Sequence, residues 1–125
     1  MKMRNKFFNR KTEADGILFD SAREAARYKV LKEMQKRGEI TALELQPKYE
    51  LLPKFYYRGQ CVRKVVYIAD FAYMTKNGQK VIEDVKGFLT KDYKIKKKLL
   101  LSRLAASGED VIFKEIFREE ENETC

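Results

Sequence analysis

The sequence predicts an α/β protein in which helices flank a mixed sheet of four to five strands. Two segments with helix-capping residues, 21–37 and 91–106, are separated by runs of β-branched and aromatic residues. A further run of this kind, 111–116, follows the second helix. Because a strand–helix–strand return normally brings its two strands parallel, we expect a mixed sheet with helices able to cover both faces.

The length and composition indicate a single domain. The chain has 125 residues, which is enough for one hydrophobic core. No apolar run is as long as a membrane span, and the N-terminus lacks the apolar region of a signal peptide. We therefore expect a cytoplasmic protein with no membrane partner.

Histidine is absent from the sequence, and cysteine is scarce. The absence of histidine excludes a Ser-His-Asp triad and every nuclease mechanism that uses a histidine base. Cys61 and Cys125 are too few and too far apart to form a disulfide framework or a zinc site. Any hydrolysis must therefore use carboxylates, lysine and metal.

The charge is unevenly distributed. The formal net charge is +8, and setting aside the four acids of residues 119–125 leaves +12 on residues 1–118. A basic body suggests a polyanionic partner, most often nucleic acid, although a merely soluble basic protein is the alternative. We divide the chain into a basic arm (1–18), a folded domain (19–118) and an acidic, disordered tail (119–125).

The N-terminal arm contains basic residues and no acid before residue 12. It is either a solvated, disordered segment or a phosphate-contacting arm, and the sequence leaves both interpretations open. The second interpretation assigns DNA contacts to Arg4, Lys6, Arg10 and Lys11.

The first helix is expected from Ser21 to Arg37. Ser21 and Glu24 have the spacing of a capping box, and Gly38 supplies the helix end. Glu24 also shares a helix face with Tyr28 and Leu31. It is therefore either a helix cap or a third acid directed towards the sheet.

Three strand-like segments follow. The segment Leu43–Leu51 alternates strictly, which predicts one strand, and Pro47 places that strand at an edge or a bulge. The segment Leu52–Tyr57 leads to a turn at Arg58-Gly59. A long strand from Cys61 to Met74 comes next.

The segment Val65–Gly87 predicts a β-hairpin around Asn77-Gly78. Each arm carries an acid at a position where a buried strand should be apolar: Asp70 in the first arm and Asp84 in the second. An uncompensated buried carboxylate costs several kcal/mol, and a divalent cation is the leading candidate to offset that cost.

The turn decides whether the two acids can share a cation. A two-residue loop would set Asp70 opposite Val85, with Asp84 on the other face and Glu83 beside Asp70. A three-residue loop with a G1 bulge would set Asp70 opposite Asp84, with Lys86 on the same face. We favour the second register because it alone places both aspartates and the lysine on one surface.

The second helix is expected from Lys91 to Ala106, with Thr90 as its N-cap and Gly108 at its end. Five lysines occupy its first half: Lys91, Lys94, Lys96, Lys97 and Lys98. Its inward side is expected to contain Ile95, Leu99, Leu100, Leu104 and Ala106. Lys96 then projects inward, and Lys94, Lys97 and Lys98 project outward as a solvated or phosphate-contacting face.

This pattern resembles the PD-(D/E)XK nuclease superfamily, which has a restriction-endonuclease-like αβββαβ core. The resemblance rests on the element order, Glu24, Asp70 and the run Asp84-Val85-Lys86; Ala69 stands where the superfamily's namesake proline would be. The chain also resembles small phage-borne proteins similar to archaeal-type Holliday junction resolvases. The matching blocks are 19–28, 45–51, 67–73 and 83–98.

The resemblance implies a Mg²⁺-dependent endodeoxyribonuclease, with Mn²⁺ able to substitute. Asp70, Asp84 and the main chain at Val85 would bind the metal, Glu24 would bind it through water or help to hold a second ion, and Lys86 would assist the attacking water. The expected substrate is branched DNA, such as a four-way junction, cut by a homodimer in phage recombination or replication in the host cytoplasm.

Three alternatives stay open at this point. The trio of Asp70, Asp84 and Lys86 could be a structural ion pair within the sheet. The nuclease could instead be a restriction- or transposition-like enzyme acting on duplex DNA. The protein could also bind DNA without cutting it, since a basic surface needs no metal.

Overall fold

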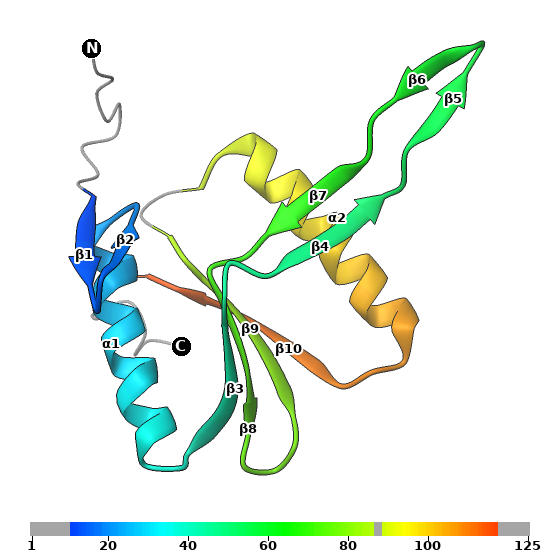
Figure 1. Cartoon of the computed structure of the whole chain (residues 1–125). Coiled ribbons are helices and arrows are strands. Elements are labelled where there is room, and N and C mark those ends of the chain that lie inside the picture. The colour runs from blue at the N-terminus through cyan, green and yellow to red at the C-terminus, as the bar shows by residue number, and fades with distance from the viewer. Residues whose placement is uncertain (1–10, 87–88, 118–125) are drawn as a thin grey trace.

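The computed structural model describes residues 11–86 and 89–117, which form a mixed α/β fold (Figure 1). Its two helices are α1 (Ala22–Lys36) and α2 (Lys91–Ser107). Its ten strands are β1 (Thr12–Ala14), β2 (Ile17–Phe19), β3 (Ile40–Leu45), β4 (Lys48–Leu52), β5 (Phe55–Tyr57), β6 (Gln60–Val62), β7 (Val65–Ile68), β8 (Phe71–Thr75), β9 (Lys80–Val85) and β10 (Val111–Ile116). Neither helix is long and apolar enough to cross a membrane.

The central sheet is mixed, as the sequence predicts. Its strand order is β10-β9-β8-β3. The return through α2 brings β10 parallel to β9, whereas β8 runs antiparallel to both of its neighbours. The parallel pair follows from the crossover connection, because a helix spans the distance that a tight turn cannot.

Each of the two long strands expected from the sequence is interrupted. The segment 43–51 is divided between β3 and β4, and the segment 61–74 contains β6, β7 and β8. The division of the first segment occurs at Gln46, whose φ is +51°, and at Pro47, which has no N–H to donate. Backbone pairing continues across the bend, because Gln46 donates to the carbonyl of Asp70 (2.9 Å) and Ala69 donates to that of Pro47 (3.0 Å). Both strands therefore bend together, and β4 and β7 leave the central sheet as a pair.

The hairpin of β1 and β2 was not expected. It lies in the stretch 1–18 that the sequence led us to assign to a basic arm, but Ala14 and Phe19 are buried against α1. The apolar residues at 14, 17 and 19 flank an Asp15-Gly16 turn, which is a hairpin signal that the basic composition obscured. Residues 12–18 thus belong to the folded domain. Residues 1–10 and the tail 119–125 lie outside the described residues.

Both helix caps match the prediction. The Ser21 hydroxyl accepts from the N–H of Glu24, and the Thr90 hydroxyl accepts from the N–H of Tyr93, each at 3.1 Å. At the end of α2, Gly108 adopts a φ of +80°, which lets the chain leave the helix without the strain that a side chain would add.

The inward face of α2 was predicted incorrectly. Ile95, Leu99 and Ala106 are exposed, while Leu100 is buried and Leu104 is half-buried. The face that meets the sheet follows Tyr93, Lys97, Leu100 and Leu104, at the helical spacing i, i+4, i+7 and i+11. The prediction failed because a lysine is counted as polar, although its alkyl stem can cover an apolar surface.

The two faces of the sheet have separate cores. Phe71, Tyr73 and Val81 pack with Tyr28 and Leu31 of α1. On the opposite face, the core consists of Leu51, Tyr67, Ala69, Ala72, Ile82 and Leu100. Because successive strand residues alternate between faces, neighbouring residues of β9 face different helices.

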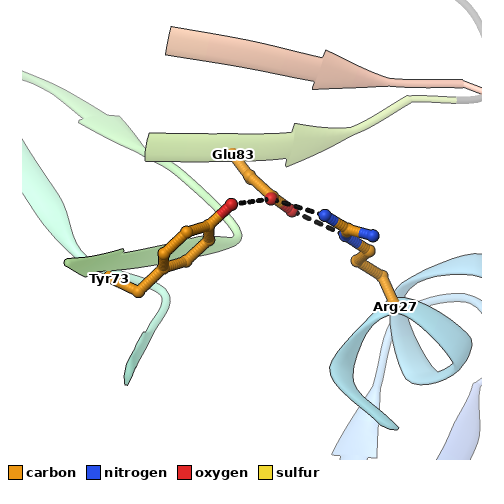
Figure 2. Close-up of polar contacts among 3 residues, drawn as sticks. All are labelled: Arg27, Tyr73 and Glu83. Carbon is orange, nitrogen blue, oxygen red and sulfur yellow. Dashed lines mark hydrogen bonds and ion pairs between the residues drawn. The ribbon is translucent and has the colours of Figure 1, made fainter. Parts of the chain in front are cut away.

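One buried acid of β9 faces α1 and is neutralised there (Figure 2). Glu83 is fully buried, and Arg27 donates to both of its carboxylate oxygens at 2.8 and 2.7 Å. The hydroxyl of Tyr73 donates a further hydrogen bond to Glu83. Burial, then the hydrogen bond and the charge of Glu83, raises the pKa of Tyr73, so its hydroxyl remains a donor. The Glu83 carboxylate therefore has both a charged partner and a further hydrogen bond, which a buried ion pair needs to offset the cost of its burial.

Replacement of Arg27 by methionine should destabilise the fold by about 3–5 kcal/mol, because Glu83 would keep a buried charge without its partner. Urea unfolding measures this change. Arg37→Met is the matched control, since the ion pair of Arg37 with Glu39 is solvent-exposed and should contribute little to stability. Equal losses in the two variants would contradict the structural role assigned to Glu83.

Candidate active site

The turn between β8 and β9 has the three-residue form. Gly78 adopts a φ of +84° and donates to the carbonyl of Thr75 at 2.9 Å, and Thr75 donates to the carbonyl of Gln79 at 2.9 Å. The strand pairs run from Met74 with Lys80 to Phe71 with Glu83. One further step sets Asp70 opposite Asp84, so the favoured register is confirmed.

Each of the two aspartate carboxylates accepts a hydrogen bond from the backbone of the segment that carries the other aspartate. One carboxylate oxygen of Asp84, Oδ1, accepts from the backbone N–H of Asp70 at 3.0 Å. In return, Oδ2 of Asp70 accepts from the backbone N–H of Val85 at 2.7 Å. The bend that ends β7 leaves Asp70 between two strands, and its side chain turns across to β9. Both carboxylates therefore lie at one point, where the β4–β7 pair leaves the sheet.

Asp84 is almost completely buried, with 1% of its surface exposed. Its Oδ2 accepts a hydrogen bond from the hydroxyl of Tyr67. Burial raises the pKa of Asp84 to about 6, against the lowering effects of the Lys86 charge and of the hydrogen bond from Asp70, while Glu115 raises it further. The charge of Lys86 thus does not offset the free-energy cost of burying the ionised Asp84 carboxylate.

Glu24 is both a cap and a third acid. Its Oε1 accepts from the backbone N–H of Asp20 at 3.1 Å at the start of α1. Its carboxyl group also meets that of Asp70. Burial, followed by the hydrogen bond and the charge of Asp70, raises the pKa of Glu24 to about 8. The two readings that the sequence left open are therefore compatible.

Lys86 follows Asp84 by two residues, and its position is fixed by an aromatic ring. Its Nζ lies 4.1 Å from the ring centroid of Tyr93, which is a cation–π distance. The hydroxyl of Tyr93 donates to Oε2 of Glu115 at 2.7 Å, and Lys97 Nζ lies 3.0 Å from the same oxygen. Glu115 is thus paired with Lys97, and the charge of Lys86 acts on the Asp84 carboxylate.

The other predicted DNA-contacting residues are dispersed. Lys91, Lys94 and Lys98 are exposed on α2, in agreement with an outward face. Lys97 was expected outward but turns towards the sheet, where it also lies 5.6 Å from the ring of Phe113. Arg4, Lys6 and Arg10 lie outside the described residues, and Lys11 pairs with Asp20 at 3.1 Å.

Lys96 is half-buried and pairs with Asp92, with their charged atoms 3.8 Å apart. It lines a shallow pocket of about 220 Å³ together with Lys86, Tyr67 and Tyr93. Lys96 thus lines the same pocket as Lys86 and pairs with an acid of its own helix. Its contact with the acidic face of the hairpin stays a prediction.

Sequence reasoning missed the tyrosines around the acids. Tyr67 binds Asp84, and Tyr93 positions Lys86. Tyr49 carries a buried hydroxyl that has no hydrogen-bond partner among residues 11–86 and 89–117. Burial, then the charges of Glu44 and Asp84, raises the pKa of Tyr49 to about 12. A signal for Tyr93 was available in the sequence. Tyr93 has helical spacing with Leu100 and Leu104, which places it on the side of α2 that faces the sheet.

The residues present fit a hard cation in chemical type. Asp70, Asp84 and Glu24 offer oxygen ligands, which suit Mg²⁺, and their charge exceeds that of Lys86. Within 11–86 and 89–117, however, no group of three or more acidic or cysteine side chains is arranged to hold a metal ion. Magnesium commonly uses one or two carboxylates and retains water ligands, so the aspartate pair meets its minimum requirement.

The chain belongs to the family described as "Protein of unknown function (DUF1064)", whose model matches residues 4–118. No match was found among curated proteins or among solved structures. The family thus covers the whole described fold and every residue of the acidic site.

In the presence of a chelator, protonated Asp84 should contribute stability that is lost as the pH rises from about 4 to 6. The folded-state pKa of Asp84 is raised to about 6, so the folded protein gains stability from protonation below that pH and loses it above. Asp84→Asn should weaken this dependence and be more stable than the wild type at pH 8 by up to about 3 kcal/mol.

Urea unfolding across this pH range measures the difference between the two proteins. Glu109→Gln is the control, because Glu109 is an exposed acid beyond the far end of α2. An unchanged profile in Asp84→Asn would show that the Asp84 carboxylate is not destabilised by its surroundings.

Proposed function

We propose that this DUF1064 protein is a Mg²⁺-dependent DNA endonuclease with a restriction-endonuclease-like core. The single observation that carries the proposal is the meeting of Asp70 and Asp84, from paired strands, with Lys86 as the neighbouring cation. Mn²⁺ is expected to substitute for Mg²⁺.

The element order supports the fold assignment. The β1–β2 and β5–β6 hairpins are set aside, and β3 with β4 and β7 with β8 are each counted as one bent strand. The chain then reads as one helix, three antiparallel strands, a crossover helix and a parallel fourth strand. This is the αβββαβ order of the PD-(D/E)XK superfamily, to which the motif of Asp70, Asp84 and Lys86 also points. The bends in the strands change the shape of the sheet but not the order of the elements along the chain.

The acidic pair provides a binding site for the cation. Asp70 and Asp84 would hold Mg²⁺, with the main chain at Val85, and Glu24 would contact a water ligand or help to hold a second ion. The bound metal would supply Lewis-acid stabilisation of the phosphate oxygens. Glu24, with its raised pKa, can also hold a proton at its carboxyl group near neutral pH.

Lys86 supplies a positive charge at the reacting phosphate. An ammonium group beside the carboxylates can orient the attacking water and offset the negative charge that develops on the phosphate in the transition state. Tyr93 limits the positions that the lysine adopts, because the ring lies under its Nζ. The pocket lined by Lys86, Lys96 and Asp92 offers two ammonium groups as contacts for a phosphate.

The basic body supports DNA as the substrate. Lys91, Lys94 and Lys98 are exposed on α2, and contacts from lysine to phosphate confer affinity with little sequence preference. We propose branched DNA, such as a four-way junction, as the preferred substrate and a homodimer as the active species, because resolution of a junction requires two symmetric cuts.

Non-catalytic DNA binding is the second candidate. It is favoured by one observation, which is that both oxygens of Asp84 already accept hydrogen bonds and the described residues contain no complete ligand group. A restriction- or transposition-like nuclease acting on duplex DNA is the alternative within the enzyme class.

Incubation of the full chain with Mg²⁺ and labelled DNAs tests the proposal, using a four-way junction, a fork, a flap, a linear duplex and a single strand. Asp84→Asn should reduce the cleavage rate at least about 100-fold, because it removes the charge that holds the cation. The same variant should bind DNA unchanged in the presence of a chelator.

Glu109→Gln is the matched control and should cleave as the wild type does. Paired symmetric nicks in the junction would support the resolvase assignment, and cleavage of the linear duplex would favour the alternative nuclease. Binding of DNA without cleavage by the wild type under both Mg²⁺ and Mn²⁺ would contradict the proposed activity.

A further inference from the structure

The β5–β6 hairpin projects from the body at the far end of the β4–β7 pair (Figure 1). Its strands pair from Phe55 with Val62 to Tyr57 with Gln60, which leaves a two-residue turn. Arg58 and Gly59 form that turn with φ values of +49° and +82°, as a tight hairpin requires. A tight turn gives the projecting segment a defined shape.

The hairpin exposes three consecutive aromatic side chains. Phe55, Tyr56 and Tyr57 are 41%, 64% and 65% exposed, and none of them belongs to either core cluster. Phe55 and Tyr57 lie on one face of the hairpin and Tyr56 on the other, because strand residues alternate. Exposed aromatic surface of this extent indicates a binding function, since folding alone would bury it.

The charge around these rings is of one sign. Residues 52–64 contain four cations and no acid: Lys54, Arg58, Arg63 and Lys64. All four are exposed, and Lys54 Nζ lies 5.9 Å from the ring centroid of Tyr56. The partner should therefore combine negative charge with flat, apolar surfaces.

We propose that the β5–β6 hairpin binds a single-stranded DNA segment, with its aromatic rings stacking on unpaired bases and its cations contacting the flanking phosphates. Nucleic acid carries both required features at a regular spacing, and stacking on aromatic side chains tolerates any base. Unpaired bases are required, because the π-faces of a duplex are covered by their neighbours.

The location of the hairpin relates this binding to the acidic site. The β4–β7 pair runs from the bend at Asp70 towards β5 and β6, and the ten steps along the chain from Gln60 to Asp70 span at most about 33 Å. DNA rises about 3.4 Å per nucleotide, so the hairpin reaches unpaired bases within about one helical turn of a phosphate at Asp70. In this respect the inference rests on the proposed function, and it narrows the substrate to DNA with an unpaired segment near the cut.

Tryptophan fluorescence tests the stacking directly. The chain has no tryptophan, so Tyr57→Trp introduces a single reporter at the hairpin, and Val30→Trp introduces one at an exposed position of α1 as the control. With a chelator present to prevent cleavage, an oligothymidylate should quench Tyr57→Trp and leave Val30→Trp unchanged. A blunt duplex should quench neither. Equal quenching by the duplex, or no quenching, would overturn the proposal.

Affinity measurements separate the two contributions. Tyr56→Ala and Tyr57→Ala should each weaken oligothymidylate binding about 5- to 150-fold with an unchanged salt dependence. Arg58→Gln should lower the slope of log affinity against log salt by about 0.7, because one phosphate contact is lost. Val30→Ala is the control and should change neither quantity.

Two outcomes distinguish this inference from its rivals. Unchanged oligothymidylate affinity in Tyr56→Ala, together with loss of a dimer in sedimentation, would overturn it and identify the hairpin as an interface between two copies. Binding is measured without cleavage, so the two proposals can fail separately. If oligothymidylate quenches the fluorescence of Tyr57→Trp while the wild type cleaves none of the DNAs, the hairpin inference is supported and the nuclease proposal is contradicted.

Discussion

The candidate site depends on the register between β8 and β9. A turn of three residues, made possible by the positive φ of Gly78, sets Asp70 opposite Asp84 rather than opposite Val85. A shift of one residue would move every side chain of β9 to the other face of the sheet. The same register therefore fixes the aspartate pair, the position of Lys86 and the direction of Glu83.

The adjacent acids of β9 illustrate two ways of holding a buried carboxylate. Glu83 faces α1, where Arg27 neutralises it through two hydrogen bonds. Asp84 faces α2, where its hydrogen-bond partners are a tyrosine hydroxyl and a backbone N–H, and its pKa rises to about 6. The first arrangement satisfies the charge within the protein. The second leaves a requirement for positive charge, which a divalent cation bound by Asp70 and Asp84 would meet.

The sequence was sufficient to predict the elements that local patterns determine. The caps at Ser21 and Thr90 follow from residue types at fixed spacing, and the mixed sheet follows from the strand–helix–strand order. The Asn-Gly turn was compatible with two registers, and the correct one was chosen because it alone gathers the two aspartates and Lys86 on one surface. The bend at Gln46 and Asp70 could not be predicted in the same way, because it depends on pairing between segments far apart in the chain. The inward side of α2 was mispredicted because Lys97 packs its stem on the sheet and pairs with Glu115. The roles assigned to Asp70, Asp84, Lys86 and Glu24 stay predictions.

The bend also relates the two proposed functional regions. It ends β7 beside the aspartates, and it directs β4 and β7 away from the central sheet towards the aromatic hairpin. One irregularity in the strands thus creates the acidic site and extends the surface that a nucleic acid could follow.

Mn²⁺ binding to the full chain, measured by titration calorimetry with paramagnetic resonance as a second readout, tests the central claim most directly. The account predicts that the wild type binds Mn²⁺, that Asp70→Asn and Asp84→Asn each abolish binding, and that Glu109→Gln leaves it intact. Binding that survives both aspartate substitutions, or no binding by the wild type, would contradict the claim that this pair holds a cation.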